Sequence, residues 1–200
     1  MKPSDIGKAY DTITHLWQSP DFNRNNGIEA RKRAIAFLTN KSSALDVGCG
    51  CTGRFIALLL AEGFVPEGVD ISDKMIALAR ERHPDIHFYQ QDICEWDIPK
   101  PYDLITAWDS LWHIPLERQK AVLAKLVAAL NQGGVLIFSF GATEEAGDHT
   151  DDFMGPEVYY STLGIHGFMD HLASLGCICR HFEYDQYPEL HAYLIVQKPG

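Results

Sequence analysis

The stretch that decides the fold of this 200-residue chain is Leu45-Asp46-Val47-Gly48-Cys49-Gly50-Cys51-Thr52-Gly53-Arg54-Phe55. Its apolar start predicts a buried strand, which three glycines interrupt, and residues 54–62 then favour a helix. Glycine adopts positive φ and lets a ligand approach the backbone, so a strand, a glycine turn and a helix together are typical of a binding turn. The glycines also fit the G-x-G-x-x-G pattern of dinucleotide-binding folds, which is weak by itself.

An aspartate follows the next predicted strand, residues 64–69. This residue, Asp70, lies 20 positions beyond Gly50. An acidic side chain at the tip of this strand can accept hydrogen bonds from ribose hydroxyls. Alternatively, Asp70 caps the helix that follows, a role that Ser72 can fill equally well. We favour the ribose interpretation because the spacing and the position coincide.

Strand and helix patterns alternate through most of the chain. Strands are expected at 86–89, 102–108 and 135–140, and helices at 73–82 and 115–132. This alternation predicts parallel strands joined by right-handed crossovers. Two further strands, 177–184 and 191–197, are separated by a short turn and must therefore pair antiparallel.

One domain, residues 1–200, is expected to contain all of these elements. Residues 1–40 form an N-terminal helical cap in this interpretation. Its Tyr10 and Asp11 could face a ligand, but a packing role is favoured for Tyr10. Residues 141–163 form a long loop without clear periodicity. Loops of that length are usually functional or disordered, and the aromatic residues Phe153, Tyr159 and Tyr160 argue against disorder.

Composition excludes several classes of partner. The formal net charge of −10 argues against nucleic acid or an anionic membrane as the main partner. No run approaches the roughly 18 apolar residues of a membrane span, and no apolar signal region opens the sequence, so export is not expected. The five cysteines, an odd number without C-x2-C spacing, favour buried thiols over disulfides or a zinc knuckle. A cytoplasmic location is expected.

Five short motifs, in their order and spacing, resemble those of the class I S-adenosylmethionine-dependent methyltransferases. They are 45–53 (LDVGCGCTG), 68–72 (GVDIS), 91–93 (QDI), 102–107 (YDLITA) and 130–136 (LNQGGVL). The tail, 151–160 with 184–189, looks like that of small bacterial members. The resemblance implies an α/β fold with three layers (αβα) and a seven-stranded, mostly parallel sheet. The implied strand order is 3-2-1-4-5-7-6, with strand 7 antiparallel.

S-adenosylmethionine is the cofactor that the resemblance implies, with S-adenosylhomocysteine as its product. By this resemblance Asp46, Gly48, Cys49 and Gly50 line the methionine and ribose part of the cofactor. Asp70 holds the ribose hydroxyls. The cofactor has no phosphates, and acidic groups suit its ammonium and sulfonium charges.

The adenine end of the cofactor is assigned to later strand ends. The resemblance implies that Ile71 packs on the adenine, that Asp92 meets the adenine amine and that Ile93 supplies a backbone contact. Ala107, at the end of the fourth strand, offers its carbonyl to the cofactor's ammonium.

Methyl transfer is an in-line displacement at carbon, so much of the catalysis can come from holding the reacting groups collinear. A general base is needed only when the acceptor arrives protonated. His113 follows the fourth strand and is the first candidate for a base; a structural role at the helix N-terminus is equally supported. His149, His166 and His191 are weaker candidates.

An aromatic acceptor pocket is expected around the ends of the strands and the loop 141–163, which is assigned to the substrate side. The residues assigned to substrate binding are Trp108, Trp112, His149, Tyr159 and Tyr160. No metal site is expected, because His149 and its neighbouring aspartates would need a further ligand.

Two other functions stay open. A nicotinamide-dependent oxidoreductase fits the glycines and Asp70, but Asp46 and the terminal antiparallel strands count against it. A binding protein that keeps the cofactor fold without catalysis is the second.

Nucleic-acid methylation is disfavoured, since neither a D/N-P-P-Y/F tetrapeptide nor a Pro-Cys dipeptide occurs. The expected partner is a small-molecule methyl acceptor, and both a monomer and a homodimer remain open.

Overall fold

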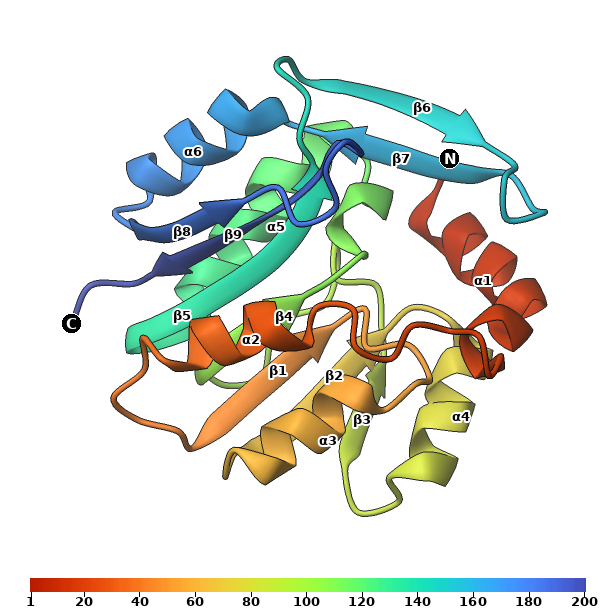
Figure 1. Cartoon of the computed structure of the whole chain (residues 1–200), viewed down its shortest axis with the longest axis horizontal. Coiled ribbons are helices and arrows are strands. Elements are labelled where there is room, and N and C mark those ends of the chain that lie inside the picture. Colours follow the sequence, from red (N-terminus) through yellow and green to blue (C-terminus); the bar gives the residue numbers. More distant parts are fainter.

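Seven strands form the central sheet of the computed structural model, which describes all 200 residues (Figure 1). In sheet order they are β3 (His87–Gln90), β2 (Val65–Asp70), β1 (Ser43–Val47), β4 (Tyr102–Ala107), β5 (Leu130–Gly141), β9 (His191–Gln197) and β8 (Ile178–Glu183). Strands β1 to β5 pair parallel, and β9 runs antiparallel to both of its neighbours. Counted along the chain within this sheet, the order is the predicted 3-2-1-4-5-7-6, so the expected fold is confirmed.

Helices cover both faces of the sheet (Figure 1). They are α1 (Pro3–Gln18), α2 (Ile28–Ile35), α3 (Arg54–Ala61), α4 (Asp73–Arg82), α5 (Leu116–Ala128) and α6 (Gly164–Ser174), with a short 3-10 turn, η1 (Leu111–His113). The α2, α3 and α4 helices cover one face, whereas α5 and α6 cover the other. None of these helices combines the length and the apolar character that a bilayer crossing requires.

The alternation of side chains along β1 shows why the sheet is buried on both faces. Leu45 and Val47 belong to the core shared with α5 and α6. Ala44 belongs to the core on the opposite face, with residues of α2 and α3. Successive strand residues point to opposite faces, so Asp46 lies on the same side as Ala44, toward α2.

The segment 141–163, expected to be a loop without regular structure, contains a two-stranded antiparallel hairpin. Its strands are β6 (Gly147–Asp151) and β7 (Val158–Thr162). In β7, Val158 and Tyr159 are buried against Ile6 and Ala9 of α1. The expectation was wrong because β6, with the sequence GDHTD, is polar and largely exposed, so it has no apolar alternation to reveal it.

Candidate functional site

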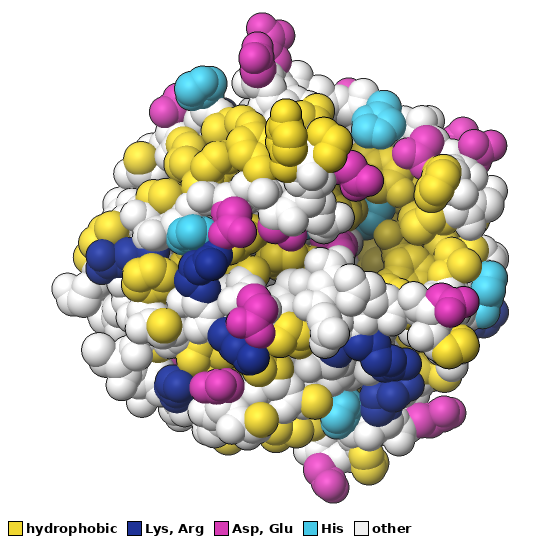
Figure 2. All heavy atoms as spheres, in the orientation of Figure 1, with side chains coloured by type: hydrophobic (Ala, Val, Ile, Leu, Met, Phe, Trp, Pro, Cys, Tyr) yellow, Lys and Arg dark blue, Asp and Glu magenta, His cyan; other side chains and the backbone are white.

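A cavity of about 360 Å³ lies at the carboxyl ends of β1, β2 and β4. Figure 2 shows a hollow on this face, bordered largely by hydrophobic side chains. Residues of α1 and of the β6–β7 turn complete its wall. Ligands bind beyond the carboxyl ends of parallel strands, and the volume is in the range of small-molecule sites.

The glycine turn after β1 forms one side of the cavity. The N–H groups of Gly48 and Cys49 both donate to the carbonyl of Val69, at 2.8 and 3.1 Å, which anchors the turn to β2. Gly48 has a φ of 68°, and a Cβ there would overlap the side chain of Ser110. Gly50 has a φ of 55°, and a Cβ there would meet no atom within 4 Å. The turn therefore presents bare backbone to open space at Gly50.

Asp70 closes this turn from the end of β2. Its Oδ2 accepts a hydrogen bond from the Gly50 N–H at 2.9 Å, and its Oδ1 accepts one from the Ser72 N–H at 3.0 Å. Burial raises the pKa of Asp70, and the two backbone donors oppose that shift. The N-cap of α4 is Ser72, whose hydroxyl accepts from the Met75 N–H, so the alternative capping role of Asp70 is not observed.

Seven of the nine residues predicted to bind the cofactor line this cavity. They are Gly48, Cys49, Gly50, Asp70, Ile71, Asp92 and Ile93. The side chain of Asp92 also accepts a hydrogen bond from the Cys94 N–H at 2.8 Å, which fixes the loop after β3. Asp46 and Ala107 are not among the lining residues.

Asp46 lies behind the glycine turn rather than along the cavity. It is 1% exposed, its Oδ1 accepts from the Thr106 hydroxyl, and it lies 3.7 Å from the guanidinium of Arg31, which is 0% exposed. Burial raises the pKa of Asp46 and lowers that of Arg31, while the pairing opposes both shifts. Asp46 thus joins β1 to α2 and lies outside the lining of the cavity.

His113, the predicted base, lies on the cavity wall with both ring nitrogens engaged. Its Nδ1 lies 2.8 Å from the Tyr159 carbonyl and therefore carries the proton. Its Nε2 lies 2.6 Å from the Tyr10 hydroxyl and 3.0 Å from the Trp112 Nε1, which both donate to it. Burial lowers the pKa of His113 to about 4. The imidazole is therefore neutral, and its lone pair is already used.

Three of the five predicted substrate-binding residues line the cavity: Trp108, Trp112 and Tyr160. The side chain of Tyr159 instead accepts from the Leu116 N–H at 3.2 Å, outside the cavity lining. His149 is also outside the lining and stacks on Tyr160, with ring centroids 5.3 Å apart. Tyr159 contributes through its backbone, and His149 supports Tyr160.

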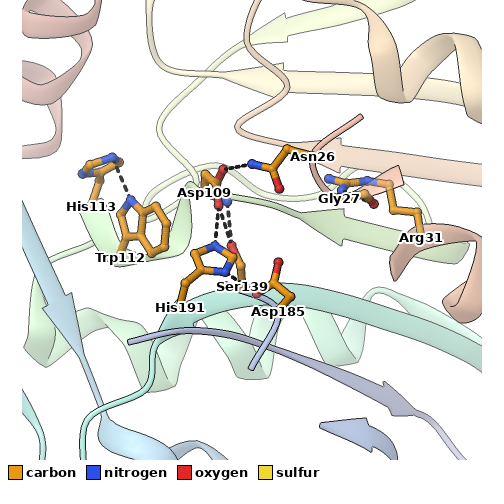
Figure 3. Close-up of polar contacts among 9 residues, drawn as sticks. All are labelled: Asn26, Gly27, Arg31, Asp109, Trp112, His113, Ser139, Asp185 and His191. Atoms are coloured by element: carbon orange, nitrogen blue, oxygen red, sulfur yellow. Dashed lines mark hydrogen bonds and ion pairs between the residues drawn. The ribbon is translucent and has the colours of Figure 1, made fainter. Parts of the chain in front are cut away.

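A polar cluster of Asp109, His191 and Asp185 lies beside the cavity (Figure 3), and of these residues the sequence singled out only His191, as a weaker candidate for a base. Asp109, directly after β4, lines the cavity and bonds to His191 Nε2 at 2.9 Å. The other ring nitrogen of His191 lies 2.5 Å from Asp185. Burial works against the charge on His191, but the hydrogen bonds to the two carboxylates outweigh it and raise its pKa to about 9. The position of Asp109 after the fourth strand was the available signal.

Arg54 is a second cavity residue that sequence reasoning missed. Its guanidinium lies over the rings of Phe22 and Phe55, 4.9 and 4.1 Å from their centroids. Its buried Nε has no hydrogen-bond partner. Burial lowers its pKa. The cavity wall therefore carries an unpaired cation as well as the carboxylates of Asp70 and Asp109.

Comparisons with known proteins agree with this geometry. A sequence profile of a family described as a methyltransferase domain matches residues 44–134. An uncharacterized methyltransferase of Bacillus cytotoxicus is 30% identical over 143 residues, which cover 68% of this chain and 67% of the relative. Trans-aconitate 2-methyltransferase of Escherichia coli O157:H7 is 32% identical over 172 residues, which cover 78% and 66%.

The fold has solved counterparts. Magnesium protoporphyrin IX methyltransferase from Synechocystis PCC 6803, solved with bound S-adenosylmethionine, superposes with a TM-score of 0.75 and 18% identity, over 99% of this chain and 98% of that one. The chain spans only 42% and 66% of the length of the first curated relatives that it matches.

Proposed function

Because the chain belongs to the class I S-adenosylmethionine-dependent methyltransferases, we propose that it transfers a methyl group from this cofactor to a small-molecule acceptor. The expected family is confirmed by the matches to methyltransferases, and these matches support the expected enzyme class. The solved counterpart with bound S-adenosylmethionine supports the expected cofactor. One relative is named for the small molecule trans-aconitate. The cavity volume of about 360 Å³ and the net charge of −10 also favour a small acceptor over nucleic acid.

The single observation that carries this proposal is that one cavity contains both a surface suited to the cofactor and a surface suited to the acceptor. The glycine turn, closed by Asp70, lies on one side, and the aromatic wall of Trp112, Tyr160 and Tyr10 completes the same cavity. A methyl donor and an acceptor must touch for in-line transfer, so both binding surfaces must share one space.

The residues present fit the cofactor. Gly50 leaves open space where a side chain would project, and Asp70 offers carboxylate oxygens to ribose hydroxyls. In this proposal Ile71 packs on the adenine and Asp92 meets its amine, both from the cavity wall. The bound cofactor supplies a methyl group on a positively charged sulfur; the protein binds it and excludes water from the reacting atoms.

On the acceptor side, Tyr10 takes the place first assigned to His113. The Tyr10 hydroxyl donates to His113 Nε2, so its oxygen keeps lone pairs that can accept a hydrogen bond from the acceptor. Burial raises the pKa of Tyr10 well above its usual value, so the phenol stays protonated. In this proposal Tyr10 orients the acceptor, and His113 positions Tyr10.

A thermal-shift titration tests the cofactor assignment. We expect S-adenosylhomocysteine to stabilise the protein and NAD to leave it unchanged; the reverse result would establish the oxidoreductase alternative. Asp70→Ala should weaken binding of S-adenosylhomocysteine tenfold or more in calorimetry, about 1.4 kcal/mol, since charge-assisted hydrogen bonds are lost. Asp85→Ala, an exposed aspartate outside the cavity, is the matched control. Binding without methyl transfer to any of a broad panel of acceptors would favour a non-catalytic binding protein.

We also propose where the protein acts and which partners it has. The acidic composition and the pattern of cysteines support action in the cytoplasm without a nucleic-acid partner. Size-exclusion chromatography with light scattering distinguishes a monomer from a homodimer.

A further inference from the structure

Asp109 has an unusual backbone conformation at the edge of the cavity. It lies directly after β4, and it is the one non-glycine residue with positive φ, 53°. Residues other than glycine rarely adopt this left-handed region, although aspartate and asparagine tolerate it best. The surrounding groups must therefore hold Asp109 in place.

Three hydrogen bonds hold it. The Asp109 N–H donates to Ser139 Oγ at 2.7 Å, and the Ser139 hydroxyl donates back to Asp109 Oδ1 at 3.1 Å. His191 Nε2 donates to the same oxygen at 2.9 Å. The second oxygen, Oδ2, has only a long contact, 3.4 Å from the amide nitrogen of Asn26. Because the side chain is 35% exposed and lines the cavity, Oδ2 is available to a ligand.

His191 links Asp109 to a second carboxylate (Figure 3). Its side chain is 9% exposed, and its two nitrogens face Asp109, after β4, and Asp185, in the turn before β9. The rings of Trp108 and Trp112 flank it, with centroids 5.7 and 5.6 Å away. Two carboxylate partners require both nitrogens to carry protons. The two carboxylates and the imidazolium together carry one net negative charge, and Asp109 is the member of the three that lines the cavity.

The chemistry of the partner follows from this arrangement. A carboxylate only accepts hydrogen bonds, so the group that meets Oδ2 must donate one. A second carboxylate there would suffer like-charge repulsion in a partly desolvated site. The remaining wall includes the apolar and aromatic side chains of Met154 and Tyr160, and the guanidinium of Arg54, which lies over the rings of Phe22 and Phe55. An amine with an apolar body satisfies both parts of the wall.

We propose that Asp109 is the binding site for an amino group, which its Oδ2 receives, and that His191 and Asp185 are the positioning residues that hold it. This inference rests on the proposed methyltransferase function. The amino group is assigned to the methyl acceptor; the other source with the same chemistry is the amino group of the cofactor's methionine portion.

Asp109→Asn is the decisive variant, because asparagine keeps the left-handed backbone and the size of the side chain while removing the charge. Asp170→Asn, an exposed aspartate on α6 without a polar partner, is the control. Calorimetry with S-adenosylhomocysteine and with 5′-methylthioadenosine, which lacks the amino acid, measures binding at the cofactor side. Benzylamine and benzoate, titrated into the S-adenosylhomocysteine complex with detection by ligand NMR, measure binding at the acceptor side.

We expect benzylamine to bind the wild-type complex with a Kd on the order of 10 mM, as for a fragment of its size, and benzoate not to bind. Asp109→Asn should weaken benzylamine at least tenfold and leave S-adenosylhomocysteine unchanged. If the variant instead weakens S-adenosylhomocysteine but not 5′-methylthioadenosine, the amino-group site stands and belongs to the cofactor. If neither effect appears, or benzoate binds as well as benzylamine, the proposal is overturned. Failure of S-adenosylhomocysteine to bind at all would contradict the proposed function itself.

The role of His191 and Asp185 as positioning residues can be tested by NMR spectroscopy. In ¹⁵N NMR, His191 should carry protons on both ring nitrogens at neutral pH and titrate near 9. Asp109→Asn and Asp185→Asn should each lower that midpoint, whereas Asp170→Asn should not. A midpoint near the ordinary histidine value of about 6.5 in the wild type would remove His191 and Asp185 from this role.

Discussion

The Tyr10 hydroxyl of α1 lies 2.6 Å from Nε2 of His113, although 103 residues separate them in sequence. Their rings meet edge to face, with centroids 5.2 Å apart. The N-terminal helix therefore forms part of the cavity wall and is more than a cover over the sheet. Burial keeps His113 neutral, and the contact with Tyr10 occupies its Nε2, so His113 is not a free base.

His113 leads to a prediction on the acid side of neutrality. Its folded pKa of about 4 lies below the unfolded value near 6.5, so the unfolded chain binds more protons between these values. The contribution of His113 to stability should therefore fall as the pH drops from about 6.5 to 4. Urea unfolding of the wild type and of His113→Gln across this range measures it. The variant should show a shallower decline, and parallel curves would contradict the assignment.

His191 leads to the opposite prediction on the alkaline side. Its folded pKa of about 9 exceeds the unfolded value near 6.5, so its stabilisation is complete below about 6.5 and is lost as the pH rises through 9. The loss should be on the order of 3 kcal/mol. Comparing wild type with His191→Gln between pH 7 and 10 isolates this group from the tyrosines and lysines. Equal slopes in the two proteins would show that His191 is not held as a cation.

The buried pair of Arg31 and Asp46 predicts a large effect on stability. Asp46→Asn leaves the guanidinium of Arg31 buried without its counter-charge, so the free energy of unfolding should fall by about 3–5 kcal/mol. Denaturant titration measures it. Glu29→Gln, which removes an exposed ion pair with Lys32, should leave stability nearly unchanged. A double variant, Arg31→Met with Asp46→Leu, should recover part of the loss, and a mild effect of Asp46→Asn alone would count against this pairing.

Alanine substitutions at Gly48 and Gly50, two glycines of the turn after β1, should affect stability and ligand binding differently. Alanine costs about 1–2 kcal/mol at either position, because both have left-handed backbones. Gly48→Ala should cost more, since its Cβ overlaps Ser110, and Ser110→Gly should relieve the excess. Gly50→Ala has free space and should mainly weaken binding of S-adenosylhomocysteine. Chemical denaturation and calorimetry on both variants test this, and identical profiles would be the contrary result.

The sequence predicted most of the sheet because its strands and helices are decided by local patterns. Helix α4 begins and ends where the apolar spacing places it, at Asp73–Arg82. The sequence did not predict β6. The pairing of β6 with β7 depends on backbone hydrogen bonds, and the polar sequence of β6 has no alternation of apolar residues. For a similar reason packing was favoured over a ligand-facing role for Tyr10, which lines the cavity: a tyrosine on an amphipathic helix has the same pattern in both cases.

The sequence by itself determined the glycine turn, the acidic end of β2 and the parallel direction of the first five strands, because each follows from residues that are close along the chain. The tertiary structure decided which of these residues face the cavity. In the tertiary structure Asp46 lies behind the turn beside Arg31. Asp109, directly after β4, is hydrogen-bonded to His191, the first residue of β9. Such contacts depend on distances between elements far apart in sequence, and on burial that sets their charges, so no local pattern encodes them.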